Sequence, residues 1–148
     1  MQAQNYTPHP IDPKIRQRIG DSVDAIELRH DVRLLFACES GSRGWGFASP
    51  DSDYDVRFIY VHRPEWYLRV QPDRDVIELP IDDELDISGW ELRKTLGLIR
   101  KGNATPAEWL GSPVVYRSDA AFVQRLREAF RLTCQPQRAF HHYLHMAR

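Results

Sequence analysis

The sequence has few cysteines, no long apolar run and no low-complexity tract. Its 148 residues include two cysteines, Cys38 and Cys134, which are too few for a disulfide framework and fit no zinc-binding spacing. No apolar stretch reaches the roughly 18 residues that a membrane-spanning helix needs, and no charged-then-apolar signal segment opens the chain. These absences argue against disulfide-rich, zinc-finger and membrane-spanning classes, and we expect a soluble, cytoplasmic protein.

Three familiar ligand-binding motifs are also missing. The glycines at 41, 44 and 46 are spaced in the opposite order to the dinucleotide-binding fingerprint, and no Walker-type lysine follows them. A calcium loop starting at Asp51 fails because Val56 stands where glycine is required and His62 where the closing glutamate belongs. A nucleotide would therefore have to bind through a different sequence motif.

Length and composition are those of one globular domain. The residues are 42% hydrophobic and 28% charged, which is close to the average for folded proteins. We expect a single domain over residues 1–148, in which 1–10 form a loose arm and 118–148 a C-terminal helical part.

Charge is distributed unevenly along the chain. Residues 1–90 carry 10 Lys and Arg against 17 Asp and Glu, whereas residues 91–148 carry 10 against 4. The acidic half suits cations and the basic half a phosphate-bearing partner, although solvated surfaces would give the same distribution. If RNA binds, the densest basic group is the expected track: Arg93, Lys94, Arg100 and Lys101.

The hydrophobic periodicity predicts an α/β or α+β domain with a sheet of about four strands. Strands are expected at residues 32–38, 55–61, 75–80 and 85–88. Helices are expected at residues 13–29, 65–70, from Gly89 to Gly102, near 106–110 and at 118–133. Between the first two strands, the Gly- and Ser-rich residues 41–53 predict a loop with at most one helical turn.

Two neighbouring motifs carry the chemical information. Residues 41–46 (GSRGWG) follow a predicted strand, and a Gly-Ser turn there exposes backbone N–H groups to which phosphate oxygens can bind. Asp53 and Asp55 lie two residues apart at the start of the next strand, so their side chains should share one face. Two carboxylates on one face repel each other unless a cation lies between them, which favours Mg²⁺ shared with substrate phosphates.

A third acid would complete such a site. Asp86 is the best candidate because it is flanked by Leu85 and Ile87, as expected of a polar group on a core strand. The neighbouring acids are better explained as solvated turn residues: Asp82, Asp83 and Glu84.

Together these segments resemble the nucleotidyltransferases of the DNA polymerase β superfamily. Residues 85–116 narrow the resemblance to the predicted nucleotidyltransferase family associated with RNA repair. The resemblance implies a mixed sheet flanked by helices, two Mg²⁺ ions (Mn²⁺ as a substitute), and transfer of a nucleoside monophosphate from an NTP such as ATP. The acceptor implied is an RNA end, a protein or a small molecule. Family members continue with a helical region beyond a point corresponding to Arg148, so a truncated C-terminal part is expected.

The same resemblance implies roles for individual residues. The residues implied in nucleotide binding are Gly41, Ser42 and Arg43, which would hold the phosphates. The residues implied in metal binding and catalysis are Asp53, Asp55 and Asp86. Asp86 would also help to deprotonate the acceptor hydroxyl.

Several alternatives stay open from the sequence. A hydrolase triad of Ser42, Asp86 and His141 has the right chain order but leaves the pair of Asp53 and Asp55 unexplained. A protein adenylyltransferase or a catalytically inactive nucleotide-binding module would keep the same motifs. Trp45 is the aromatic residue best suited to stack on a base. His141 and His145 have metal-pair spacing, but a solvated or interface helix explains them better.

Overall fold

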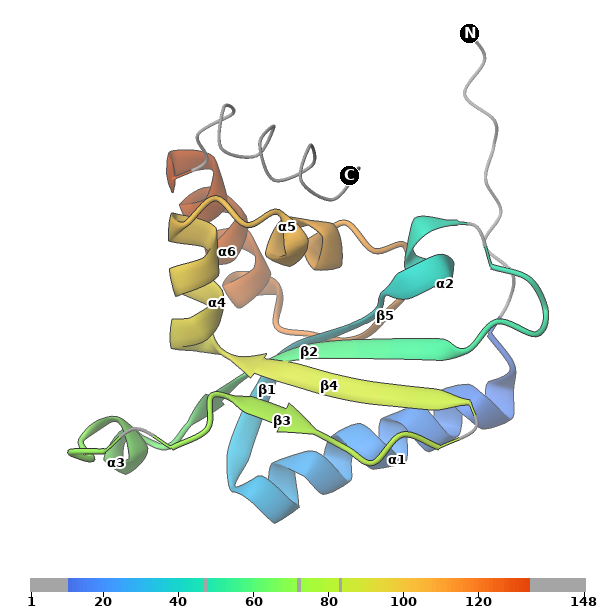
Figure 1. The fold of residues 1–148 in the computed structure, drawn as a ribbon, viewed down its shortest axis with the longest axis horizontal. Coiled ribbons are helices and arrows are strands. Elements are labelled where there is room, and N and C mark those ends of the chain that lie inside the picture. Colours follow the sequence, from blue (N-terminus) through green and yellow to red (C-terminus); the bar gives the residue numbers. More distant parts are fainter. Residues whose placement is uncertain (1–10, 47, 72, 83, 134–148) are drawn as a thin grey trace, which may run out of the picture.

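A computed structural model describes residues 11–46, 48–71, 73–82 and 84–133. Its centre is a five-stranded mixed sheet with the strand order β3-β4-β2-β1-β5 (Figure 1). The strands are β1 (Val32–Glu39), β2 (Tyr54–His62), β3 (Val76–Glu78), β4 (Leu85–Glu91) and β5 (Val115–Ser118). The helices are α1 (Pro13–His30), α2 (Gly41–Trp45), α3 (Pro64–Tyr67), α4 (Leu92–Arg100), α5 (Thr105–Leu110) and α6 (Ala120–Thr133). The expected arm at 1–10 lies outside the described residues.

The directions of the strands determine which side chains lie close together at each end of the sheet. β2 and β4 run parallel, whereas β1 pairs antiparallel with both β2 and β5, and β3 pairs antiparallel with β4. Since β2 and β4 point the same way, both begin at one edge of the sheet, close to α2 (Figure 1). α3 and α4 lie toward the opposite edge.

Helices cover both faces of the sheet (Figure 1). On one face, α1 buries Ile19, Val23 and Ile26 against strand residues that include Val56 and Phe58. On the other face, α4, α5 and α6 pack over β1 and β2. The buried residues of this second core are Phe36, Cys38, Ile59, Ile99, Trp109, Leu110, Val123 and Leu126. Close packing on both sides fixes the strands, and with them the side chains at the strand ends.

The first predicted helix is confirmed as α1, with the expected start. The carboxylate of Asp12 accepts a hydrogen bond from the backbone N–H of Lys14 at 2.7 Å, and Pro13 occupies the first helical turn. The helix ends at Asp31, whose positive φ of 49° turns the chain directly into β1. This short connection places β1 alongside the helix that covers it.

The sheet has one more strand than we expected. β5 was missed because it is a four-residue edge strand without a buried residue, so it shows no alternation of apolar and polar side chains. β4 also continues through Glu91, whereas the change of period predicted a helix from Gly89. The strand persists because Glu91 still pairs with Tyr60 of β2. Its carboxylate then caps α4 by accepting from the backbone of the first helical turn.

Two exclusions made from the sequence can be examined in the described ranges. Cys38 is fully buried, and burial raises the pKa of its thiol to about 12, so it acts as a core residue rather than a reactive thiol. Cys134 lies outside the described residues. Within those residues, no helix combines the length and apolar character needed to cross a membrane.

Candidate functional site

Two acidic side chains meet where the parallel strands begin. Asp55 is the second residue of β2 and Asp86 the second of β4, and the strand register sets them directly opposite each other. The guanidinium of Arg57 lies between them, with Nη2 3.2 Å from Asp55 Oδ1 and 2.6 Å from Asp86 Oδ2. These side chains are partly buried, from 20% exposed for Arg57 to 33% for Asp86. Two of the three expected metal ligands are therefore neighbours, and a cationic group bridges them.

The glycine loop packs directly on this acidic pair. Gly41 has a positive φ of 54°, and a Cβ atom at this position would lie 1.9 Å from Oδ2 of Asp55. The preceding residue, Ser40, donates its backbone N–H to the carbonyl of Asp55 at 2.7 Å. Only a residue without a side chain allows the backbone to come this close to the carboxylate. The loop and the acidic pair consequently form one continuous surface.

A buried glutamate holds the start of β2 in place. Glu39, at the end of β1, is fully buried and accepts the backbone N–H of Asp55 at 2.7 Å. Its other carboxylate oxygen accepts the hydroxyl hydrogen bond of Tyr116 in β5. Burial raises the pKa of Glu39, and the negative charge of Asp55 acts in the same direction, while the bond from Tyr116 opposes the shift. Glu39 thus positions the backbone of Asp55 from beneath the site.

Arg43 faces the loop rather than the outside. Its side chain is 5% exposed, and its guanidinium donates to the carbonyls of Ser52 at 2.6 Å and Asp53 at 3.3 Å. It also lies over the ring of Tyr54, 4.0 Å from the ring centre. Arg43 therefore fastens α2 to the residues that precede β2, and in this conformation its donors do not point toward a phosphate.

Asp53 is the remaining acid that the resemblance implies as a metal ligand. It precedes β2, is exposed, and lines a separate cavity of about 430 Å³ together with Asp51 and Glu84. Over the described ranges, no three His, Cys, Asp or Glu side chains are arranged so that they could hold a metal ion. The structure brings Asp55 and Asp86 together, and the role of Asp53 as a third ligand stays a prediction.

A smaller cavity opens beside the glycine loop. It has a volume of about 350 Å³ and lies between α2 and α5, with Ser40, Trp45 and Trp109 in its lining. Trp45 is 55% exposed, so its indole is accessible at this cavity, and its stacking on a base stays a prediction. The Ser42 hydroxyl has no hydrogen-bond partner among the described residues.

The basic residues that follow Asp86 in sequence lie at the other end of the sheet. β4 carries the chain away from Asp86 before α4 begins (Figure 1). Lys94 forms an ion pair with Asp75 at 3.1 Å, and Arg93 lies over the ring of Tyr67. Closeness to Asp86 in sequence thus does not place this group at the acidic pair, and an RNA track over α4 stays a prediction.

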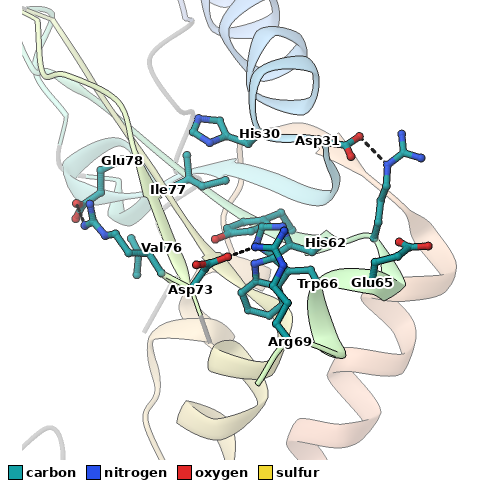
Figure 2. A pocket seen from close by; sticks show the side chains of 13 residues that line it. His30, Asp31, His62, Glu65, Trp66, Arg69, Asp73, Val76, Ile77 and Glu78 are labelled. Carbon is teal, nitrogen blue, oxygen red and sulfur yellow. Dashed lines mark hydrogen bonds and ion pairs between the residues drawn. The ribbon is translucent and has the colours of Figure 1, made fainter. Parts of the chain in front are cut away.

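A larger cavity, of about 730 Å³, lies at the far end of β2 (Figure 2). His62 stacks on Trp66 there, with ring centres 4.1 Å apart, next to the ion pair of Arg69 with Asp73. The other arginines of the lining also pair with acids, Arg63 with Asp31 and Arg74 with Glu78. We place the candidate site at the acidic pair and not in this cavity, because the glycine loop contacts Asp55 of the pair and is absent from the lining of the cavity.

Lowering the pH is expected to destabilise the protein in part through His62. Its Nε2 is buried and has no hydrogen-bond partner among the described residues, and burial lowers the pKa of the imidazole below 6.5. The unfolded chain therefore takes up this proton more readily, so the free energy of unfolding falls as the pH drops below about 6.5. Urea unfolding at several pH values should show a weaker pH dependence for His62→Phe. The control is His30→Phe, at the mouth of the same cavity; an unchanged slope in His62→Phe would contradict the assignment.

Sequence reasoning missed two residues of the site. Arg57 follows Asp55 by two positions, so strand alternation alone puts both side chains on one face, and this signal was present. Glu39 looks like the polar end of a strand, and its burial depends on Tyr116, which is distant in sequence. The hydrolase triad cannot be placed, because His141 lies outside the described residues, as does His145.

Comparison with known proteins agrees with the motifs. The chain matches the family described as "RNA repair pathway DNA polymerase beta family" over residues 15–148. It is also 51% identical, over 134 residues, to YcgL, an uncharacterized protein of Bacillus subtilis (strain 168). That alignment covers 90% of this chain and 52% of YcgL, so the chain spans about half the length of this relative. Since the family match includes the glycine loop and all three predicted acids, the chain belongs to the RNA repair pathway DNA polymerase beta family.

Proposed function

We propose that the protein is a metal-dependent nucleotidyltransferase that moves a nucleoside monophosphate from an NTP, with ATP as the first candidate, to a hydroxyl acceptor. The observation that carries the proposal is the pairing of Asp55 with Asp86, together with the close approach of the Gly41 backbone to the carboxylate of Asp55. Phosphoryl-transfer sites need carboxylates for a cation and a backbone that phosphate can approach closely, and both are present here. Membership of a polymerase β family supports the same chemistry.

The acidic pair fits a hard divalent cation such as Mg²⁺ or Mn²⁺. Both donors are carboxylates, and the pair already accommodates a positive group in Arg57. A bound ion of this kind neutralises the triphosphate and lowers the pKa of the acceptor hydroxyl. Asp53 is proposed as a third carboxylate ligand of the ion only because of the resemblance to polymerase β nucleotidyltransferases.

The other residues of the site bind and position. Gly41 and Ser42 are proposed to hold the phosphates, because Gly41 allows close approach and the Ser42 hydroxyl is uncommitted among the described residues. Arg43 keeps the loop in place, and Glu39 fixes the backbone of Asp55. Asp86 is proposed to orient the acceptor hydroxyl and to help remove its proton.

The acceptor proposed is an RNA end. The description of the family points to RNA repair, and the smaller cavity beside Trp45 has room for an aromatic base next to the loop. The chain spans about half the length of YcgL, so binding of the acceptor by the whole protein is a proposal as well.

Incubation with each α-labelled NTP, Mg²⁺ and an RNA pool tests the function. Label in the RNA supports the proposal, and label in the protein fraction supports the adenylyltransferase alternative. A matched reaction with Asp55→Asn should transfer no label, which separates the protein's own activity from that of a contaminant. If no acceptor is labelled while Mg²⁺ and NTP together still raise the melting temperature, the protein is an inactive nucleotide-binding module.

A further inference from the structure

The positive group that lies between Asp55 and Asp86 is the guanidinium of Arg57. Nη2 of Arg57 contacts both Asp55 Oδ1 and Asp86 Oδ2, and Nη1 donates to the carbonyls of Asp86 at 2.9 Å and Val56 at 3.1 Å. Four oxygen atoms thus hold one guanidinium, which is itself only 20% exposed. A partly buried guanidinium with several charge-assisted hydrogen bonds is held more strongly than one in a single exposed ion pair.

This arrangement conflicts with direct binding of a metal ion between the same carboxylates. A divalent ion takes carboxylate oxygens at about 2.0–2.6 Å, and Arg57 already engages one oxygen of each carboxylate, Oδ1 of Asp55 and Oδ2 of Asp86. Two cationic groups also repel each other at such short range. An ion bound between the two carboxylates therefore lies within close range of the guanidinium, and each disfavours binding of the other.

We infer that Arg57 is an internal competitor for the metal site: in the absence of an ion it compensates part of the negative charge of Asp55 and Asp86, and it leaves at least one of them when an ion binds between them. This inference rests on the proposed function, because it concerns the same carboxylates. Its consequence is that the metal ion alone binds weakly. Phosphate oxygens brought in by a nucleotide favour binding, since they add ligands for the ion and an alternative partner for the displaced guanidinium.

A purely structural role for Arg57 makes the opposite prediction. If the arginine only holds the two carboxylates in position for the ion, its removal lets them separate and weakens metal binding. If Arg57 acts only as a distant positive charge, a lysine at this position has the same effect as the arginine. Metal affinity in the absence of nucleotide distinguishes these cases.

The experiment is a calorimetric titration with Mn²⁺ of the wild type, Arg57→Gln and Arg57→Lys, without nucleotide. Competition predicts that Arg57→Gln binds Mn²⁺ about tenfold more tightly than the wild type, because the bridging group is gone. Arg57→Lys should lie between them, since lysine keeps the charge but lacks the second nitrogen that donates to the carbonyls of Asp86 and Val56. The matched control is Arg63→Gln, which removes an arginine paired with Asp31 in the remote cavity and should leave the affinity unchanged.

A measurement on the wild type avoids any dependence on the folding of the variants. The guanidinium protons of Arg57 are held by four acceptors, so in NMR spectra they should show restricted rotation that is released on saturation with Mg²⁺. Unchanged Arg57 signals at saturation, or weaker Mn²⁺ binding by Arg57→Gln, would overturn the inference and leave the proposed function standing. If neither the wild type nor any variant binds a divalent ion, with or without NTP, the proposed function fails together with the inference.

Discussion

Asp86→Ala is expected to bind Mg²⁺–NTP within about tenfold of the wild-type affinity and to lose transfer activity by a factor on the order of 10² or more. Asp86 stands at the start of β4, opposite Asp55, and we propose that it acts on the attacking hydroxyl. A group that acts on the nucleophile contributes more in the transition state than in the bound ground state, so its loss lowers kcat more than affinity. Single-turnover transfer and equilibrium binding of a labelled NTP measure the two quantities separately.

A nearby acid provides the control for this experiment. Glu84 lies two residues before Asp86, is exposed, and reaches Arg18 at 3.5 Å rather than the acidic pair. Glu84→Ala should therefore keep transfer activity close to that of the wild type. Full activity in Asp86→Ala, or an equal loss in Glu84→Ala, would reopen the choice of the carboxylate that acts on the acceptor hydroxyl among the acids of this turn.

How much of the site could be predicted from the sequence depended on how local its parts are. The glycine loop, the Asp-x-Asp pair and the strand that follows them are neighbours in sequence. Their spacing alone is enough to predict a phosphate-binding and metal-binding function. Asp86 was selected for its apolar neighbours, but its position opposite Asp55 depends on the parallel pairing of β2 with β4. Such long-range pairing is set by the packing of the whole sheet and leaves no local signal.

The positions of two further groups could not be predicted for the same reason. The basic residues of α4 are close to Asp86 in sequence, but the continuation of β4 to Glu91 carries them to the other end of the sheet. Arg43 looked like a phosphate ligand because of its place in the loop, whereas tertiary contacts turn it onto the carbonyls of Ser52 and Asp53. In both cases the residue type was interpreted correctly, and its direction was decided by contacts distant in sequence.

Gly41→Ala is expected to lower both stability and transfer. The new Cβ would lie 1.9 Å from Oδ2 of Asp55, and alanine also disfavours the positive φ of 54°. The strained backbone alone costs about 1–2 kcal/mol in the free energy of unfolding, and the carboxylate must move to remove the clash. A displacement of about 1 Å in a positioning group is enough to reduce turnover on the order of 10²-fold, so transfer should fall even where the variant is fully folded.

Two further variants separate the clash from a general effect of alanine. A Cβ atom at Gly97 in α4 would meet no other atom within 4 Å, so Gly97→Ala should be neutral or raise the free energy of unfolding by about 0.5–1 kcal/mol. Asp55→Ala removes the carboxylate that Gly41→Ala would strike, so the stability losses of the two changes should be less than additive when they are combined. Urea unfolding of the single and double variants gives this coupling. Strict additivity, with wild-type transfer in Gly41→Ala, would mean that the glycine loop does not act through Asp55.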